Sequence, residues 1–348
     1  MIFSANEIEI LKTLFIGPYS HGSTSLMRVH CIISLMNLTQ FKIIDIEVPF
    51  FEYNRINRSL ASRYKIGPLI GGVNRYILDQ LSDDFVYDFV WVDKGVFIKP
   101  EIIGKLREKS NLLIHYTPDP AFTFHRSRFF FKAVCYYDYC ITTKSFEIEN
   151  YKKAGAEQII YCTQGYDKFI HKPYHSFHEK EKAVSFVGHY ENYRGEIIKK
   201  LIENGIEVHV AGFKWKHFFK KYQHYSNLYY HGEGVFGEDY AKFISSSYLS
   251  LGLVSKWIPE LHTTRTMEIP ACGTLLVTEL NSETIHLYEK NEAVFFEDIV
   301  ELTQKIISLL KDKCVIEEHI IKANKRLATS QYDYESIVYD ILYKIGLV

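Results

Sequence analysis

Two glutamates, Glu260 and Glu268, enclose seven residues in the segment ELHTTRTME, a spacing that could place both carboxylates on one ligand. Thr263 and Thr264 suit the N-terminus of a helix. Glu260 then precedes the helix and Glu268 lies about two turns further on. Arg265 shares a helical face with Glu268 because the two stand three positions apart. One carboxylate could bind ribose hydroxyls while the other meets a sugar, although a chain with 42 acidic residues can contain this spacing by accident.

A candidate for contact with an anion is Arg194, in the segment GHYENYRGE of residues 188–196. Gly188 follows a predicted strand, and Arg194 falls where the next helix begins. A guanidinium at a helix N-terminus could hold a diphosphate through two parallel hydrogen bonds. The alternative is an arginine on the exposed surface.

The candidate general base of the N-terminal half is Asp119 in HYTPDP, residues 115–120. Pro118 and Pro120 restrict the backbone around it to an extended conformation. A general base needs such a fixed position. Asp119 could equally be a loop residue that makes a turn, and His115 could be a core histidine instead of a site residue.

The loop GPYSHGSTSLMR, residues 17–28, follows the first predicted strand and contains Gly17, Tyr19, His21 and Gly22. Its glycines permit tight turns, and the hydroxyl residues after Gly22 can cap the next helix. The loop is neither GxGxxG nor a P-loop, so it does not indicate a dinucleotide site. It is either an ordinary strand-to-helix turn or a helix N-terminus that meets an anion or a sugar hydroxyl.

Short apolar runs alternate with helical patterns, as is typical of strands buried on both faces of a parallel sheet. Six runs from KTLFIG to QIIYC precede the polar segment HKPYHSFHEKEK, residues 171–182, which we interpret as a linker, and six from AVSFVG to AVFF follow it. The sequence therefore predicts an α/β protein with β/α/β domains in 1–172 and 173–328, and a C-terminal helix in 329–348 that packs back on the first. Ligands of such sheets bind beyond the carboxyl ends of the strands, where the candidate residues lie.

Composition narrows the classes of function. The net charge of −1 gives no support for a nucleic-acid partner. The six cysteines form no CxxC pair or zinc spacing, which favours reduced thiols in a cytoplasmic protein. The N-terminus lacks a signal-peptide pattern, and no apolar run approaches the roughly 20 residues of a membrane span. We expect a cytoplasmic protein.

From about residue 90 to 300, the chain resembles glycosyltransferases of the GT-B fold, and most closely the branch of the spore maturation protein B family. The resemblance rests on LHTTRTMEIPACGTLLVTE with LYEKNEAVFFED downstream, and on WVDKGVFIKPEI, HYTPDP, YDYCITTKSFEIENYKKAGA and SFVGHYENYRGEII, in the order of the family. It implies two Rossmann-like domains facing across a cleft, with a nucleotide-sugar donor in the second and a saccharide or lipid-linked acceptor in the first.

The resemblance also implies roles for single residues. Glu268 matches the acid expected on the donor ribose, and Glu260 matches the first acid, where this branch often has Asp. Arg265, Thr263 and Thr264 fall where the family contacts the donor phosphates or the sugar. Together with the residues singled out above from their loops, we expect donor binding by Gly188, Arg194, His262, Thr263, Thr264, Arg265 and Glu268, catalysis by Asp119, His115 and Glu260, and acceptor contacts by Gly17, Tyr19, His21, Gly22 and Lys94.

The family is generally metal-independent, and the only DxD-like run, SDD at 82–84, lies before a predicted strand and not after one. We therefore expect no metal and no cofactor. Cationic side chains and helix termini would stabilise the leaving diphosphate.

Two alternatives to a glycosyltransferase stay open. One is an inactive binding module of the same fold, and the other is a phosphorylase, which would usually need a pyridoxal-bearing lysine and a longer chain. An inverting reaction would need the base, whereas a retaining one would not. The aromatic and basic segments 122–132 and 213–225 could make peripheral contact with a membrane; the alternative is that they form core and acceptor wall.

Overall fold

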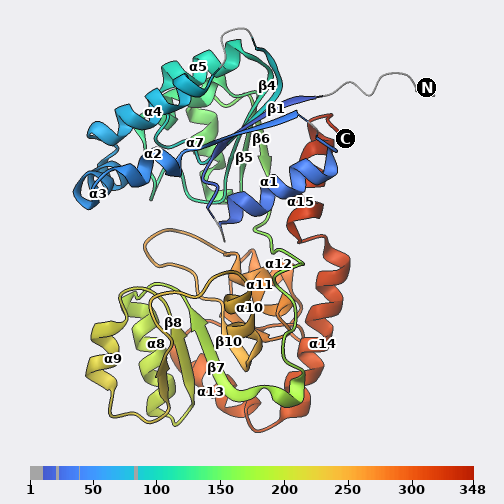
Figure 1. The fold of residues 1–348 in the computed structure, drawn as a ribbon. Helices are drawn as coiled ribbons and strands as arrows, with labels where there is room; N and C mark the ends of the chain where they lie inside the picture. Colours follow the sequence, from blue (N-terminus) through green and yellow to red (C-terminus); the bar gives the residue numbers. More distant parts are fainter. Residues whose placement is uncertain (1–10, 21–22, 39, 82–84) are drawn as a thin grey trace, which may run out of the picture. The chain divides into compact units, whose positions relative to one another are not determined.

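The computed structural model describes residues 11–20, 23–38, 40–81 and 85–348, and it divides the chain into two compact units. Unit 1 comprises Met1–Thr163 and Ile337–Val348, and unit 2 comprises Gln164–Ser336. Each unit contains a six-stranded parallel sheet with helices on both faces (Figure 1). The predicted α/β class with two Rossmann-like units is confirmed.

The sheet of unit 1 has the strand order β2-β1-β3-β4-β5-β6. Its strands are β1 (Lys12–Gly17), β2 (Gln40–Asp45), β3 (Tyr87–Asp93), β4 (Ser110–Thr117), β5 (Tyr139–Thr142) and β6 (Gln158–Tyr161). The chain runs outward from β1 to β2 and then returns to the other side of β1 with β3. The carboxyl ends of β1 and β3 therefore form the switch point of this sheet, the usual place of a ligand.

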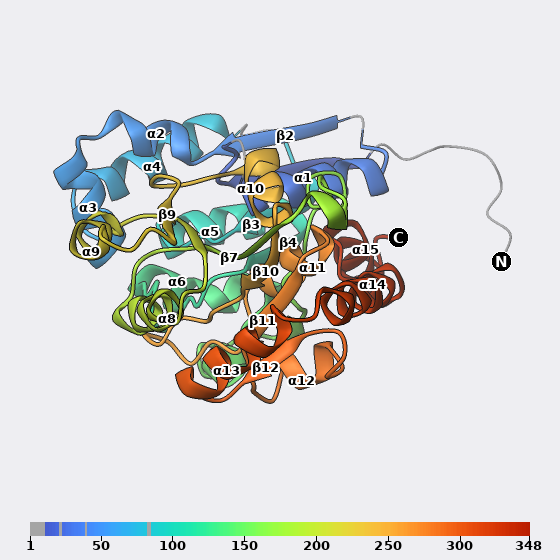
Figure 2. The same cartoon turned by 90° about the horizontal axis from the view of Figure 1, so that it is seen from below.

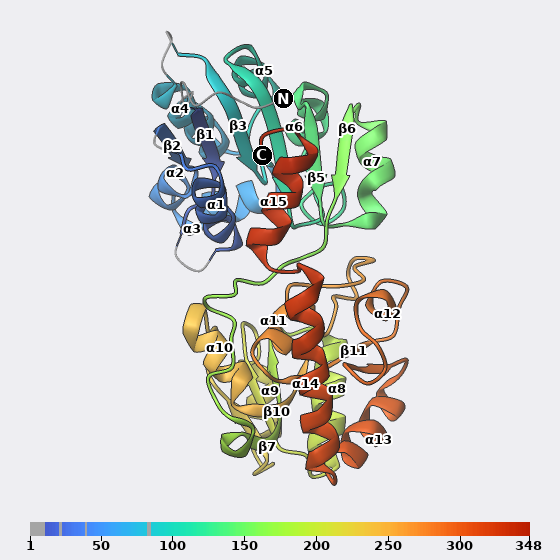
Figure 3. The same cartoon turned by 90° about the vertical axis from the view of Figure 1, so that its right-hand side faces the viewer.

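Two hydrophobic clusters hold the helices of unit 1 against its sheet. One face carries α2 (Glu47–Glu52), α3 (Arg55–Tyr64), α4 (Pro68–Gln80), α5 (Pro100–Glu108), α6 (Arg128–Ala133) and α7 (Ile148–Lys153), with the 3-10 turns η1 (Val134–Tyr136) and η2 (Ser145–Glu147). The other face carries α1 (Thr24–Leu35) and α15 (Tyr334–Lys344). Figure 3 shows α15 on that face of the unit 1 sheet.

The sheet of unit 2 has the strand order β12-β11-β10-β7-β8-β9. Its strands are β7 (Glu181–Val187), β8 (Val208–Ala211), β9 (Leu228–Tyr230), β10 (Ser247–Leu251), β11 (Leu275–Glu279) and β12 (Val294–Phe296). The chain runs from β7 to β9 on one side and from β10 to β12 on the other. The switch point therefore lies between β7 and β10, which are hydrogen-bonded neighbours.

The helices of unit 2 also form two layers. One face of the sheet packs against α8 (Asn192–Glu203), α9 (Lys216–Tyr222) and α13 (Ile299–Leu309), the last of which lies next to β12 (Figure 2). The other packs against α10 (Gly237–Ser245), α11 (Arg265–Ala271) and α12 (Thr284–Leu287). The long helix α14 (Lys313–Ser330) contributes side chains to both clusters. In the described ranges, no helix combines the length and apolar composition of a membrane span.

Residues 171–182, which we interpreted as a linker, lie wholly within unit 2. Both the backbone of this segment and the side chain of Lys180 bind the end of α10. The backbone N–H groups of Tyr174 and His175 donate to Oγ of Ser245, and Nζ of Lys180 donates to the Ser245 carbonyl. The segment then forms η3 (Phe177–Glu179) and enters β7.

Candidate functional site

Arg194 lies in the first turn of α8, beyond the carboxyl end of β7, and its side chain is buried. With only 5% of the residue exposed, the alternative of a surface arginine is wrong. Its Nη1 donates to the His189 carbonyl at 3.0 Å and forms an ion pair with Glu191 at 3.0 Å. These contacts hold the guanidinium in one orientation at the switch point of the sheet.

A second guanidinium, that of Arg265, stands close to the first. Arg265 begins α11, after the loop that follows β10, and its Nη2 donates to the Leu253 carbonyl at 3.1 Å. Burial and then the charge of Arg265 lower the pKa of Arg194 to about 10. In the described part of the chain, the buried Nε atoms of both arginines lack a hydrogen-bond acceptor. Two neighbouring cations with unused donors favour an anionic ligand.

Glu268 lies one turn further along α11 and is 7% exposed. Its Oε2 accepts a hydrogen bond of 2.7 Å from the Tyr240 hydroxyl, and its Oε1 is 3.9 Å from Nε2 of His171. Nδ1 of His171 accepts from the Asp167 N–H, so the proton of a neutral His171 is on Nε2. The hydrogen bond from Tyr240 fixes the carboxylate. Among the contacts described, Oε1 makes no hydrogen bond, because its distance of 3.9 Å to His171 is too long for one.

The predicted helix start at Thr263 and Thr264 is confirmed, since Thr264 is the N-cap of α11. The sequence also predicts that Pro270 and Gly273 end the helix; Gly273 follows it with φ of 71°, but Pro270 lies inside the last turn. Proline cannot donate to the carbonyl four residues earlier, that of Thr266. The Tyr288 hydroxyl donates to this carbonyl instead, at 2.9 Å.

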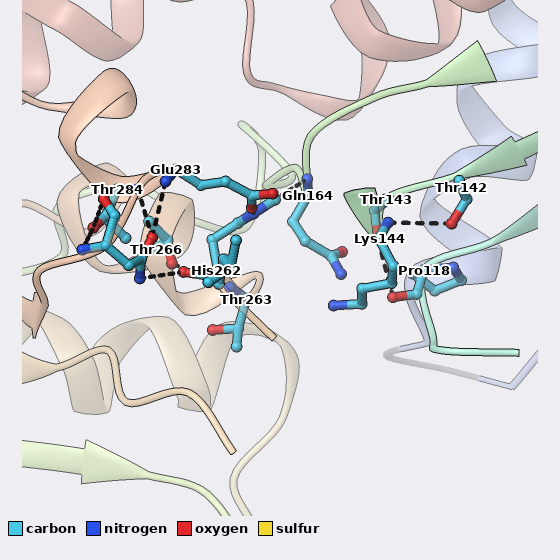
Figure 4. Close-up of polar contacts among 12 residues, drawn as sticks. Pro118, Thr142, Thr143, Lys144, Gln164, His262, Thr263, Thr266, Glu283 and Thr284 are labelled. Carbon is cyan, nitrogen blue, oxygen red and sulfur yellow. Dashed lines mark hydrogen bonds and ion pairs between the residues drawn. The ribbon is translucent and has the colours of Figure 1, made fainter. Parts of the chain in front are cut away.

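His262 is engaged on both ring nitrogens, as Figure 4 shows. Its Nε2 accepts from the Gln164 N–H at 3.0 Å, so Nδ1 carries the proton and donates to Glu283. His262 therefore anchors the loop between β10 and α11 in this structure and does not present a free nitrogen to a ligand. Thr263 beside it is buried, and its N–H donates to Oγ1 of Thr266.

Glu260 is partly buried in the same loop, and its charge acts on Arg194 by opposing the lowering of the arginine pKa. Gly188 directly follows β7, and its carbonyl accepts from Nε1 of Trp215 at 2.8 Å. A Cβ atom at Gly212 would lie 1.9 Å from this carbonyl oxygen. The backbones after β7 and β8 therefore approach each other directly, which explains the glycines without a ligand.

In unit 1, Asp119 forms an ion pair with Lys94 at 2.9 Å, and about a third of each side chain is exposed. Lys94 follows β3 in a left-handed conformation, with φ of 68°. Burial would raise the pKa of Asp119, but the charges of Lys94 and His125 outweigh it, and the pKa lies below its ordinary value. Asp119 is thus a carboxylate of low basicity beside the cationic Lys94.

His115 lies in the core of unit 1, with no exposed surface. Its ring packs against Phe130, Tyr137 and Tyr151 at centroid distances of 4.5, 5.2 and 6.1 Å. Burial lowers its pKa to about 4. Of the two readings, the structure supports the core histidine.

The structure brings Glu147 to the Asp119 loop, and sequence reasoning missed this residue. Its buried carboxylate accepts from the N–H groups of Ala121, Phe122 and Thr123 and from the Thr123 hydroxyl, at 2.7 to 3.1 Å. The Thr143 hydroxyl also donates to the Pro118 carbonyl, at 3.0 Å (Figure 4). No local pattern marks Glu147, because its partners stand about 25 positions earlier in the chain.

The loop after β1 is only partly described. A Cβ atom at Gly17 would lie 2.7 Å from Cβ of Asp93, so the glycine allows β1 and β3 to end in close contact. Asp93 is buried in an ion pair with Arg28 of α1, at 2.8 Å. The Tyr19 N–H donates to Asp45 at 3.2 Å. His21 and Gly22, and the SDD run at 82–84, lie outside the described residues.

The two Rossmann-like units, with candidate residues at the switch point of each sheet, define the GT-B fold of glycosyltransferases. A family described as "Glycosyl transferase-like" matches residues 194–343, which include Arg194, Arg265 and Glu268. This match supports the broader group of the resemblance, while its spore maturation protein B-like branch stays a prediction. A comparison with curated proteins found no match.

Solved structures of the same fold span nearly the whole chain. Anabaena Alr3699/HepE in complex with UDP and glucose is 13% identical over 97% of this chain and 100% of that chain, with a TM-score of 0.64. Sucrose-phosphate synthase from Thermosynechococcus elongatus is 10% identical over 96% and 98%, with a TM-score of 0.65. An E. coli structure described as trehalose-6-phosphate bound with UDP-2-fluoro glucose is 10% identical over 97% and 99%, with a TM-score of 0.64. Identities this low show the fold alone.

Proposed function

We propose that this protein is a glycosyltransferase that transfers a sugar from a nucleotide-sugar donor bound by unit 2. The observation that carries the proposal is the pair of guanidiniums, Arg194 and Arg265, at the switch point between β7 and β10. The fixed carboxylate of Glu268, one turn further along α11, would accept hydrogen bonds from the donor ribose. The family match over residues 194–343 supports the same class of reaction.

We propose a UDP-sugar as the donor, because structures of the same fold contain UDP, UDP-glucose or UDP-2-fluoro glucose. As the sugar leaves, negative charge develops on the diphosphate. Fixed cations in a buried site stabilise such charge without a cost of reorganisation. Arg194 and Arg265 would supply this stabilisation, and we propose that transfer needs no metal ion.

We propose that unit 1 binds the acceptor, a saccharide or a lipid-linked sugar, near Lys94 and Tyr19. Asp119 is the proposed base of an inverting reaction. Its lowered pKa keeps it ionised but makes it a weak proton acceptor, since the best base has a pKa near the working pH. Asp119→Asn should abolish transfer with donor affinity unchanged if the reaction inverts; near-normal turnover would remove Asp119 from the mechanism and favour retention.

The test of the proposed function starts with donor hydrolysis, using a panel of UDP-, GDP-, dTDP- and CMP-sugars. Release of nucleotide from one donor, most strongly from a UDP-sugar, is the expected result. Calorimetry then compares UDP with uridine. Arg194→Ala and Arg265→Ala should weaken UDP binding about 10- to 150-fold, as expected for a hydrogen bond to a charged group, and uridine binding much less. Arg326→Ala is the matched control, because Arg326 of α14 pairs with Glu289 and Glu292 and belongs to neither of the two loops.

Equal losses for UDP and uridine would show that neither arginine binds phosphate. A second candidate function is an inactive nucleotide-sugar-binding module of the same fold. The same experiment separates the two, because that module would bind UDP without releasing nucleotide from any donor. We also propose a cytoplasmic location, with peripheral contact to the inner face of the membrane.

A further inference from the structure

A group of metal-ligating side chains gathers at the end of the unit 2 sheet that is opposite to the loops described above. Among the described residues, Glu181, Glu207 and His209 each offer a ligand atom, and these atoms all lie within 4.8 Å of one another. Nε2 of His209 is 3.1 Å from Oε1 of Glu207 and 3.5 Å from Oε2 of Glu181. Glu181 begins β7 and Glu207 directly precedes β8, so both stand at the amino ends of these strands.

Strand pairing explains why these three residues meet. β7 and β8 are parallel neighbours, with Ser185 paired to His209 and Val184 to Val208. Residues two or four positions apart along a strand share a face of the sheet. Glu207 and His209 therefore project to the same side, and Glu181 reaches them from the start of β7, ahead of the register shift between Glu181 and Val184.

His231, which follows β9, orients the His209 ring. Nδ1 of His209 is 3.1 Å from Nε2 of His231. When Nε2 of His231 accepts the Nδ1 proton, Nε2 of His209 is free to bind a metal ion. The Nε2 lone pair of His209 then faces two carboxylate oxygens. A cation between the three atoms suits this tautomer, whereas in the other tautomer Nε2 donates a hydrogen bond to Glu207 at 3.1 Å.

We propose that Glu181, Glu207 and His209 bind one divalent transition-metal ion, with His231 as a positioning residue. Zinc bonds to nitrogen and carboxylate oxygen are about 2.0–2.2 Å long, which corresponds to about 3.3–3.5 Å between ligand atoms of a tetrahedron. The 3.5 Å distance from Nε2 of His209 to Glu181 matches this spacing, and the 3.1 Å distance to Glu207 is slightly shorter. The mixed nitrogen and oxygen donors favour zinc or a similar ion over magnesium, which prefers an octahedron of oxygens.

This ion would be structural. It would tie the amino ends of β7 and β8 together, whereas the proposed donor contacts follow the carboxyl ends of β7 and β10. The expectation that sugar transfer needs no metal is therefore unaffected. Loss of the ion should lower the stability of unit 2 and leave its affinity for UDP unchanged.

The test uses the full-length protein after treatment with a chelator. Calorimetric titration with ZnCl₂ should show one ion per chain at this site, and zinc should raise the melting temperature. Glu181→Gln and Glu207→Gln should each weaken zinc binding at least tenfold. His231→Ala should weaken it by about 10- to 100-fold, as is usual for a group that orients a metal-bound histidine. Glu238→Gln, an exposed change on α10, is the matched control and should leave zinc binding intact.

The double variant Glu181→Gln/Glu207→Gln should fold normally, because the side chains of Glu181 and Glu207 are both about half exposed. Equal zinc binding by this variant and the wild type would overturn the proposal. So would the absence of zinc binding to the wild type, which would leave His209 as a hydrogen-bond donor to Glu207. If magnesium bound as tightly as zinc, the cluster would be an acidic surface that does not select between cations. UDP affinity, measured in parallel, reports on the donor site independently.

Discussion

At the scale of single residues, the donor carboxylate can be tested directly. Glu268→Ala should weaken UDP binding by about 10- to 150-fold, because a hydrogen bond to a charged group contributes about 1.5–3 kcal/mol. Calorimetry on the folded variant gives the affinity. Tyr240→Phe removes the 2.7 Å hydrogen bond to Oε2 but keeps the carboxylate, and should cost less. Unchanged UDP affinity in a folded Glu268→Ala protein would exclude the ribose role.

His115 should make the stability of unit 1 depend on pH. Burial lowers its pKa to about 4 from the ordinary value of 6.5, so below pH 6.5 the unfolded chain binds a proton that the folded unit does not. The free energy of unfolding should therefore fall from pH 6.5 to about pH 4, by about 3 kcal/mol in total. Urea unfolding across this range measures the fall.

His115→Phe keeps an aromatic ring among Phe130, Tyr137 and Tyr151 and removes the titrating group. This variant should lose most of the pH dependence between pH 4 and 6.5. An equally steep fall in the variant would assign the effect to other groups.

At the scale of elements, η2 positions the loop that carries Asp119. Burial raises the pKa of Glu147, but its carboxylate accepts three backbone N–H groups of this loop. Glu147→Gln turns an amide NH₂ toward these donors and should cost about 1–3 kcal/mol of stability for each donor left unpaired. We expect kcat to fall with the KM for the donor unchanged. Glu149→Gln, two positions on and exposed, is the control and should leave kcat intact.

The region from residue 122 to 132 can be tested for membrane contact. Phe130 is buried in the core, which agrees with the alternative that part of this segment packs inside unit 1. The exposed aromatic and basic residues of this segment are Phe124, Arg126, Arg128, Phe131 and Lys132. Cosedimentation with anionic vesicles should be strong at low salt and weak at high salt, and each basic residue changed to Ala should cost about 1 kcal/mol. Protein that stays in the supernatant at low salt would exclude the contact. In residues 213–225, Trp215 and Phe218 are core residues, so this segment offers less apolar surface.

At the scale of the whole molecule, unit 1 contains the two ends of the described chain. Ile337, Val338, Ile341 and Leu342 of α15 are buried in the same cluster as Phe15 and Trp91 of the central strands. Leu342→Ala should destabilise unit 1 by about 2–5 kcal/mol, as is usual for a buried leucine. The measurement is thermal unfolding with and without UDP.

UDP stabilises the unit that binds it, so it should raise the transition of unit 2, whereas Leu342→Ala should lower that of unit 1. Tyr343→Ala is the neighbouring control, because Tyr343 is 66% exposed. A Leu342→Ala protein that unfolds like the wild type would show that α15 adds little to unit 1.

The sequence by itself determined the local features of this protein. Runs such as FVYDFVWV and TLLVTE became buried parallel strands, and the helix that carries Arg265 and Glu268 begins directly after Thr264, although the Thr264 side chain makes no capping hydrogen bond. These features were readable because hydrophobic periodicity and helix capping depend on neighbours within a few positions. The α/β class and the position of the candidate residues beyond the strand ends follow from the same patterns.

Only the tertiary structure decided which distant residues meet. Strand order places Arg194 beside Arg265, Glu147 beneath the Asp119 loop, and Glu181 beside Glu207 and His209. It also buries His115, and it shows that residues 171–182 bind α10 rather than link two domains. The physical reason is that pairing across a sheet depends on the order and register of its strands, which no local pattern encodes.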